Sequence, residues 1–71
     1  MEKVELLKSL GARIHKLREE RNITQQDLGA MCNIEKSNMT RIESGRTNPT
    51  FLTLYKISKA LNIPVSMLVE I

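Results

Sequence analysis

The chain has 71 residues, which is long enough for one domain around one hydrophobic core and too short for two. Hydrophobic residues make up 41% of the sequence and aromatic residues only 3%, so we expect an aliphatic core. The formal net charge of +3 suits a polyanionic partner and is equally compatible with an ordinary charged surface, so the positions of the charges have to decide between the two.

Few residues of the kinds used for metal binding, disulfides or catalysis are present. Cys32 is the only cysteine, and its apolar setting in the sequence favours a small buried side chain over a reactive thiol. His15 is the only histidine, and no partners complete a metal site or a nucleophile–base pair with it. We therefore predict no metal, no cofactor and no enzymatic activity. Without a signal peptide or a long apolar run, the sequence indicates a protein of the reducing cytoplasm that does not enter a membrane.

The first predicted helix runs from about Val4 to Arg21. Gly11 within it permits a close contact with a second helix, and Asn22 suits the left-handed conformation that often follows a helix C-terminus. The apolar residues of this helix recur three and four positions apart and so form one stripe. These residues are Leu7, Leu10, Ile14 and Leu17.

The second predicted helix begins after Thr24, whose hydroxyl can cap it, with Asp27 in the capping-box position. It ends near Asn33. The third covers about Lys36–Ser44 and stops at Gly45, a residue suited to the left-handed conformation. The residues expected on the inner face of the second helix are Leu28, Met31 and Cys32.

Pro49 or Thr50 opens a fourth predicted helix, and Pro64 opens a short fifth one that runs through Leu68. The short connections between the helices predict an all-α fold, a compact five-helix orthogonal bundle. The residues expected to face inward from the fourth helix are Phe51, Leu54, Ile57 and Leu61.

The stretch from Gln25 to Ser44 has the features of a helix-turn-helix. Gly29 is small at the point where two crossing helices approach each other, and Asn33 tolerates the positive φ needed at the corner. Four apolar residues can lock the two helices onto the rest of the core. These are Leu28, Ile34, Met39 and Ile42.

At this point the sequence resembles the Cro/cI family of repressors, also called the xenobiotic-response-element helix-turn-helix family. The resemblance covers about residues 13–69. It implies that the whole chain, 1–71, is one lambda-repressor-like DNA-binding domain, with its helix-turn-helix motif at 25–44. The matching residues are Leu17-Arg18, Thr24 to Leu28, Ile34, Arg41 to Thr50, Leu54, Ile57, Ala60 to Ile63 and Leu68.

The third helix has an outer face that suits the reading of base edges in the major groove of double-stranded DNA. Arg41 can pair with a guanine, and Lys36 can donate to a guanine or to a phosphate. Ser37 and Thr40 are short and versatile. The alternative is an ordinary solvated face of an amphipathic helix. Glu35, at the start of the helix, can accept from cytosine N4 or simply remain solvated near the positive helix end.

Other positions are implied by the resemblance to contact phosphates or to hold the fold together. Gln25 matches a family position that contacts a phosphate and braces the recognition helix. Arg18 and Glu43 match positions that form an internal ion pair between the first and third helices. Further candidates for phosphate contacts are Asn38, Arg46, Thr47 and Asn48, of which the last can equally be a helix-start residue.

We expect a homodimer, since a single module of this size makes a small interface with DNA. The candidate interface consists of apolar residues on the fourth helix and near the C-terminus, and the alternative is that they are ordinary scattered surface hydrophobes. These are Leu52, Tyr55, Val65, Val69 and Ile71. The sequence thus predicts a sequence-specific transcriptional regulator, a repressor or controller on a pseudo-palindromic operator, with no small-molecule effector. The alternative is an antitoxin or another protein-interaction module.

Overall fold

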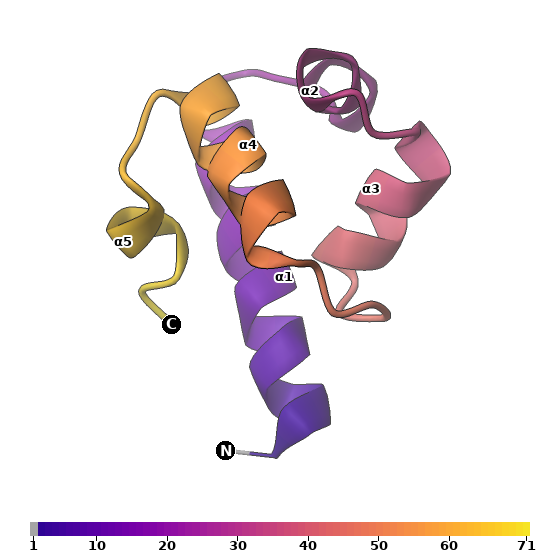
Figure 1. Cartoon of the computed structure of the whole chain (residues 1–71), viewed down its shortest axis with the longest axis vertical. Helices are drawn as coiled ribbons and strands as arrows, with labels where there is room; N and C mark the ends of the chain where they lie inside the picture. Colours follow the sequence, from indigo (N-terminus) through magenta and orange to yellow (C-terminus); the bar gives the residue numbers. More distant parts are fainter. Residues whose placement is uncertain (1) are drawn as a thin grey trace.

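The computed structural model describes residues 2–71, and within this range it contains five helices and no strand (Figure 1). They are α1 (Lys3–Glu19), α2 (Gln25–Cys32), α3 (Lys36–Glu43), α4 (Phe51–Leu61) and α5 (Val65–Leu68). The first turns of α1 extend beyond the other helices, and α3 and α5 lie on opposite sides of the bundle. The predicted all-α five-helix fold is confirmed. No helix in the described range is both long and apolar enough to cross a membrane.

The helices begin and end where local side-chain chemistry dictates. The Thr24 hydroxyl accepts a hydrogen bond from the backbone N–H of Asp27 at 3.0 Å, and Thr50 caps α4 in the same way. Left-handed residues follow three of the helices, with φ of 56° at Asn22, 58° at Asn33 and 58° at Asn62. Asparagine tolerates this conformation because its short side chain forms local hydrogen bonds.

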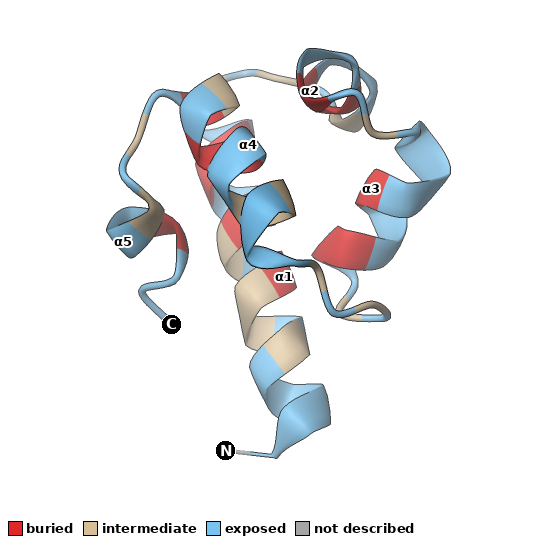
Figure 2. Cartoon of the chain, viewed as in Figure 1, coloured by how far each residue is buried: buried red, intermediate tan, exposed pale blue. Residues whose placement is uncertain are grey.

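The core is aliphatic, as the composition predicts, and it lies where the inner faces of the helices meet (Figure 2). No aromatic ring of the described residues belongs to it. Cys32 belongs to this core, and burial raises the pKa of its thiol. The positive charge of nearby Lys56 lowers that pKa, but by less than burial raises it. The buried apolar residues are Ile14, Leu17, Leu28, Cys32, Met39, Ile42, Ile57, Leu61 and Leu68.

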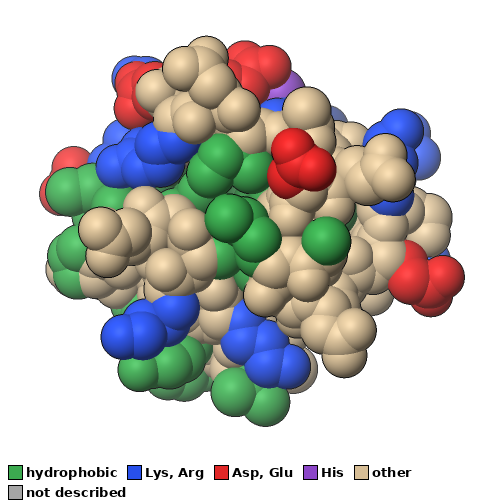
Figure 3. Space-filling view, turned by 90° about the horizontal axis from the view of Figure 1, so that it is seen from above, with side chains coloured by type: hydrophobic (Ala, Val, Ile, Leu, Met, Phe, Trp, Pro, Cys, Tyr) green, Lys and Arg blue, Asp and Glu red, His purple; other side chains and the backbone are tan. Residues whose placement is uncertain are grey.

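Two residues expected in the core are instead exposed. Met31 is 60% exposed because the buried arc of α2 runs through Leu28, Cys32 and Gly29, and Met31 lies just beyond its edge. Phe51 is 68% exposed because it is the first residue of α4, whose buried residues lie only in its second half. On the face shown in Figure 3, hydrophobic side chains are exposed at several places, with Lys and Arg side chains beside them.

Candidate nucleic-acid interface

The turn between α2 and α3 is tight and depends on a glycine. The backbone N–H of Ile34 donates to the carbonyl of Gly29 at 2.7 Å, which closes the turn behind the left-handed Asn33. A Cβ atom at Gly29 would collide with the carbonyl oxygen of Ile34. The small residue at this position is therefore required by the close approach of the two helices, as the sequence predicts.

The C-terminal end of α3 lies directly against α1. A Cβ atom at Gly11 would collide with the carbonyl oxygens of Ile42 and Glu43, so the close helix contact expected at this glycine is present. Gly45 then ends α3 with a φ of 76° and packs against the backbone of Lys8. These contacts determine the angle at which α3 leaves the bundle.

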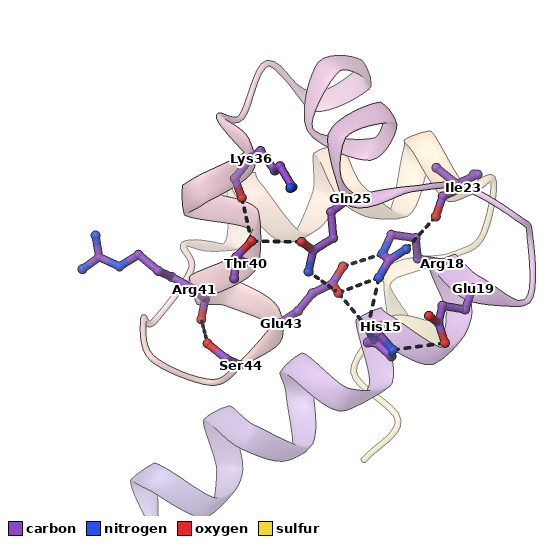
Figure 4. A network of polar contacts seen from close by, with 10 residues as sticks. All are labelled: His15, Arg18, Glu19, Ile23, Gln25, Lys36, Thr40, Arg41, Glu43 and Ser44. Carbon is purple, nitrogen blue, oxygen red and sulfur yellow. Dashed lines mark hydrogen bonds and ion pairs between the residues drawn. The ribbon is translucent and has the colours of Figure 1, made fainter.

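Arg18 and Glu43 form a buried ion pair between α1 and α3 (Figure 4). The Arg18 Nε donates to Glu43 Oε2 at 2.7 Å and Nη2 donates to Oε1 at 3.0 Å, which is the bidentate geometry. The two side chains are only 7% and 3% exposed. A third donor of the guanidinium, Nη1, reaches the carbonyl of Ile23 at 2.7 Å. The hydrogen bond with Glu43 raises the pKa of Arg18.

Glu43 receives two further contacts at its Oε1 atom. Gln25 Nε2 donates to it at 3.0 Å, and His15 Nδ1 lies 2.9 Å away. Burial by itself would raise the pKa of Glu43, but the hydrogen bonds from Arg18, Gln25 and His15 outweigh it, and the pKa is lower than usual. Glu43 is therefore a carboxylate that stays ionised within the fold.

His15 belongs to this network, whereas sequence reasoning treated it as isolated. Its Nε2 lies 3.1 Å from Glu19 Oε1, and its Nδ1 lies between Glu43 and Arg18. The spacing of His15 to Arg18 and Glu19, three and four residues apart on one helix, is the signal that could have revealed it. Its contact with Glu43 depends on tertiary structure.

The outer face of α3 is polar and exposed, while Met39 and Ile42 on its inner face are buried. Arg41 extends away from the bundle (Figure 4). Thr40 donates its hydroxyl toward Gln25 Oε1 at 2.9 Å and toward the carbonyl of Lys36 at 3.0 Å. The exposed residues of this helix are Lys36, Ser37, Asn38, Thr40 and Arg41.

The remaining candidate residues lie at the two ends of α3. Glu35 precedes the helix, is exposed and makes no side-chain capping bond. Three others, Asn38, Thr47 and Asn48, line one hollow between α3 and the start of α4. Asn48 does not start α4, because the residue that caps this helix is Thr50. Arg46 is exposed after Gly45.

The amino-acid sequence is similar to those of known helix-turn-helix regulators. The helix-turn-helix family model HTH_3 matches residues 14–68. The uncharacterized HTH-type transcriptional regulator y4dJ of Sinorhizobium fredii is 32% identical over 60 residues, which cover 84% of this chain and 78% of the regulator. The immunity repressor of Bacillus phage phi105 is 39% identical over 61 residues, or 86% of this chain, but the match spans only 42% of the repressor.

Solved structures show the same fold. The restriction-modification controller protein C.AhdI of Aeromonas hydrophila superposes with a TM-score of 0.91 at 24% identity, covering 96% of this chain and 99% of that one. The clp gene regulator ClgR of Corynebacterium glutamicum gives a TM-score of 0.87 at 22% identity, covering 90% of this chain and 82% of its own. The chain therefore belongs to the HTH_3, or Cro/cI-type, helix-turn-helix family and is a DNA-binding transcriptional regulator, not an enzyme.

Proposed function

We propose that the protein is a repressor or autoregulating controller that binds a pseudo-palindromic operator as a homodimer in the bacterial cytoplasm. The observation that carries the proposal is α3, whose outer face is polar and exposed while its inner face is buried in the core. Such a helix suits the major groove, where base edges offer donors and acceptors. The similarity to a phage immunity repressor supports repression.

The side chains around the outer face of α3 differ in what they can recognise. Arg41 carries a fork of donors that matches guanine O6 and N7, and Lys36 can donate to guanine or to a phosphate. Ser37 and Thr40 present short hydroxyl groups, and Glu35 is an acceptor suited to cytosine N4. We propose that these five residues recognise the base sequence of the operator.

Phosphate contacts belong to the two flanks of α3. Gln25 lies at the first position of α2, where backbone N–H groups favour an anion, and its Nε2 has a second hydrogen besides the one given to Glu43. Arg46 is exposed beyond the other end of α3. Asn38, Thr47 and Asn48 line the hollow between α3 and the start of α4. These contacts would supply affinity that falls with salt and carries no sequence information.

The homodimer rests on the exposed apolar residues of α4 and the C-terminal segment. One such module covers only on the order of 600–1,000 Å² of its own surface on DNA, so a second copy adds needed specificity. Val65 is half-buried and lines a hollow together with Tyr55. The exposed fractions of the other proposed interface residues are 61% for Leu52, 45% for Tyr55, 42% for Val69 and 48% for Ile71.

Selection of bound sequences from a random DNA pool, at two salt concentrations, tests this proposal. We expect a palindromic consensus with half-sites about one helical turn apart, since a two-fold dimer places two copies of α3 in successive major grooves. Raising the salt should weaken binding without altering the consensus. Binding with no sequence preference at either salt concentration would overturn the proposal.

A further inference from the structure

The hydroxyl group of Thr40 has its single proton committed inside the protein. Its Oγ1 lies 2.9 Å from Gln25 Oε1 and 3.0 Å from the carbonyl oxygen of Lys36, and both partners can only accept. A hydroxyl has one proton and two lone pairs. Whichever acceptor takes the proton, the groups that Thr40 presents outward from α3 are a lone pair and a methyl group.

The orientation of the Gln25 amide is determined by the buried ion pair. Arg18 has only donors, and it holds both oxygens of Glu43, which as a carboxylate has only acceptors. The atom of Gln25 that faces Glu43 must therefore be Nε2, which leaves Oε1 directed at Thr40 (Figure 4). Hydrogen-bond donation therefore runs inward from the outer face of α3, from Thr40 to Gln25 and from Gln25 to Glu43.

We infer that Thr40 acts as a hydrogen-bond acceptor at the DNA and reads the exocyclic amino group of a base, adenine N6 or cytosine N4. This inference rests on the proposed placement of α3 in the major groove. Guanine O6 and N7, thymine O4 and the phosphate oxygens all accept hydrogen bonds, so they are not partners for an acceptor. Thr40 then complements Lys36 and Arg41, which can only donate. Gln25 Oε1 and the Lys36 carbonyl are the two acceptors that direct the Thr40 proton into the protein.

The test uses the full chain and the operator obtained by selection. Each adenine of a half-site is replaced by purine, and each cytosine by 2-pyrimidinone, so that only the amino group is lost. Affinities are measured for the parent protein and for Thr40→Val, which keeps the shape of the side chain but has no hydroxyl. At one position per half-site, we expect loss of the amino group to weaken the parent about tenfold and Thr40→Val hardly at all. The analogue that shows this effect identifies the base.

Three control variants separate the alternatives. Ser37→Ala removes another exposed hydroxyl of α3, and Glu35→Met removes the carboxylate that is the other acceptor proposed to face a base. Both should keep the sensitivity to the amino group that Thr40→Val loses. Gln25→Met removes one of the two acceptors of the Thr40 proton, and because the Lys36 carbonyl remains to hold it, this variant should also keep the sensitivity to the amino group.

The failures of the two proposals are distinguishable. Absence of any consensus would contradict the proposed function itself. A consensus at which the parent and Thr40→Val respond equally to every amino deletion would overturn the inference about Thr40. A Thr40→Val variant that loses affinity equally for cognate and unrelated DNA would show a phosphate contact, and a loss traced to guanine N7 with 7-deazaguanine would show that Thr40 donates. Either result would also overturn the inference.

Discussion

At the scale of single residues, Glu43 connects α3 to both α1 and α2. It is buried, and its carboxylate is contacted by Arg18 and His15 from α1 and by Gln25 from α2. A buried charge of this kind is tolerated only when its partners satisfy it. Its contribution to function is one of position: it holds α3 against α1 and, through Gln25, reaches Thr40 on the outer face.

Replacing Glu43 by alanine should lower the free energy of unfolding by about 3 kcal/mol, because Arg18 would remain buried without its partner. Urea denaturation of the parent and the variant measures this difference. Glu20→Ala is the matched control, since Glu20 is an exposed carboxylate whose only ion pair among residues 2–71 is a 4.0 Å contact with Arg21. Its effect should stay within about 0.5 kcal/mol. Unchanged stability of the Glu43 variant would contradict the structural role of the pair.

The same carboxylate predicts how stability depends on pH. The pKa of Glu43 is lower in the folded protein than in the unfolded chain, where it is about 4.3. The unfolded state therefore takes up a proton first as the pH falls, so this contribution is complete above that value and is lost as the pH decreases toward the folded pKa. Denaturation curves between neutral and acidic pH should show the loss, and Glu43→Gln should remove that part of the pH dependence.

At the scale of elements, the angle between α2 and α3 depends on backbone contacts that side chains would block. Gly29→Ala introduces a better helix former, yet its Cβ would collide with the Ile34 carbonyl. We expect a loss of about 2 kcal/mol from overpacking, together with weaker DNA binding because α3 must shift. Thermal unfolding and a binding titration measure the two effects.

Ala30→Gly is the matched control for the Gly29 variant. Ala30 is exposed on the same helix, so this change lowers helix propensity by about 1 kcal/mol without altering any close contact. The Ala30→Gly variant should bind DNA with the affinity of the parent under conditions in which both proteins are folded. If Gly29→Ala proves more stable than the parent, the collision at the turn does not govern the angle.

At the scale of the whole molecule, the proposed homodimer depends on the exposed apolar residues of α4 and the C-terminal segment. Leu52→Glu places a charge in the proposed interface and should convert a dimer into a monomer, with a matching loss of operator affinity. Sedimentation velocity at micromolar concentrations measures the first effect. Val4→Glu is the control, because Val4 is 60% exposed on α1, against 61% for Leu52, and lies outside the proposed interface. A parent protein that sediments as a monomer would contradict the proposed dimer.

The sequence by itself determined the order of the helices and most of their ends. Capping by Thr24 and left-handed residues such as Asn33 and Gly45 act within a few positions of the chain, so they can be recognised before any tertiary contact is known. The inner faces of α1 and α3 were also predictable, because apolar residues at helical spacing indicate a buried side. The Arg18–Glu43 pair was implied by the family resemblance, and the structure contains it.

Only the tertiary structure decided which residues the bundle covers and how its polar groups connect. Met31 and Phe51 have apolar side chains of the kind found in protein cores, and both are exposed. Their exposure depends on where the neighbouring helices end, and the spacing of apolar residues in the sequence does not encode those positions. The contacts of Glu43 with His15 and Gln25 join positions 28 and 18 residues apart. Such contacts arise from the packing of α1, α2 and α3, and no local pattern determines them because each depends on the relative placement of separate helices.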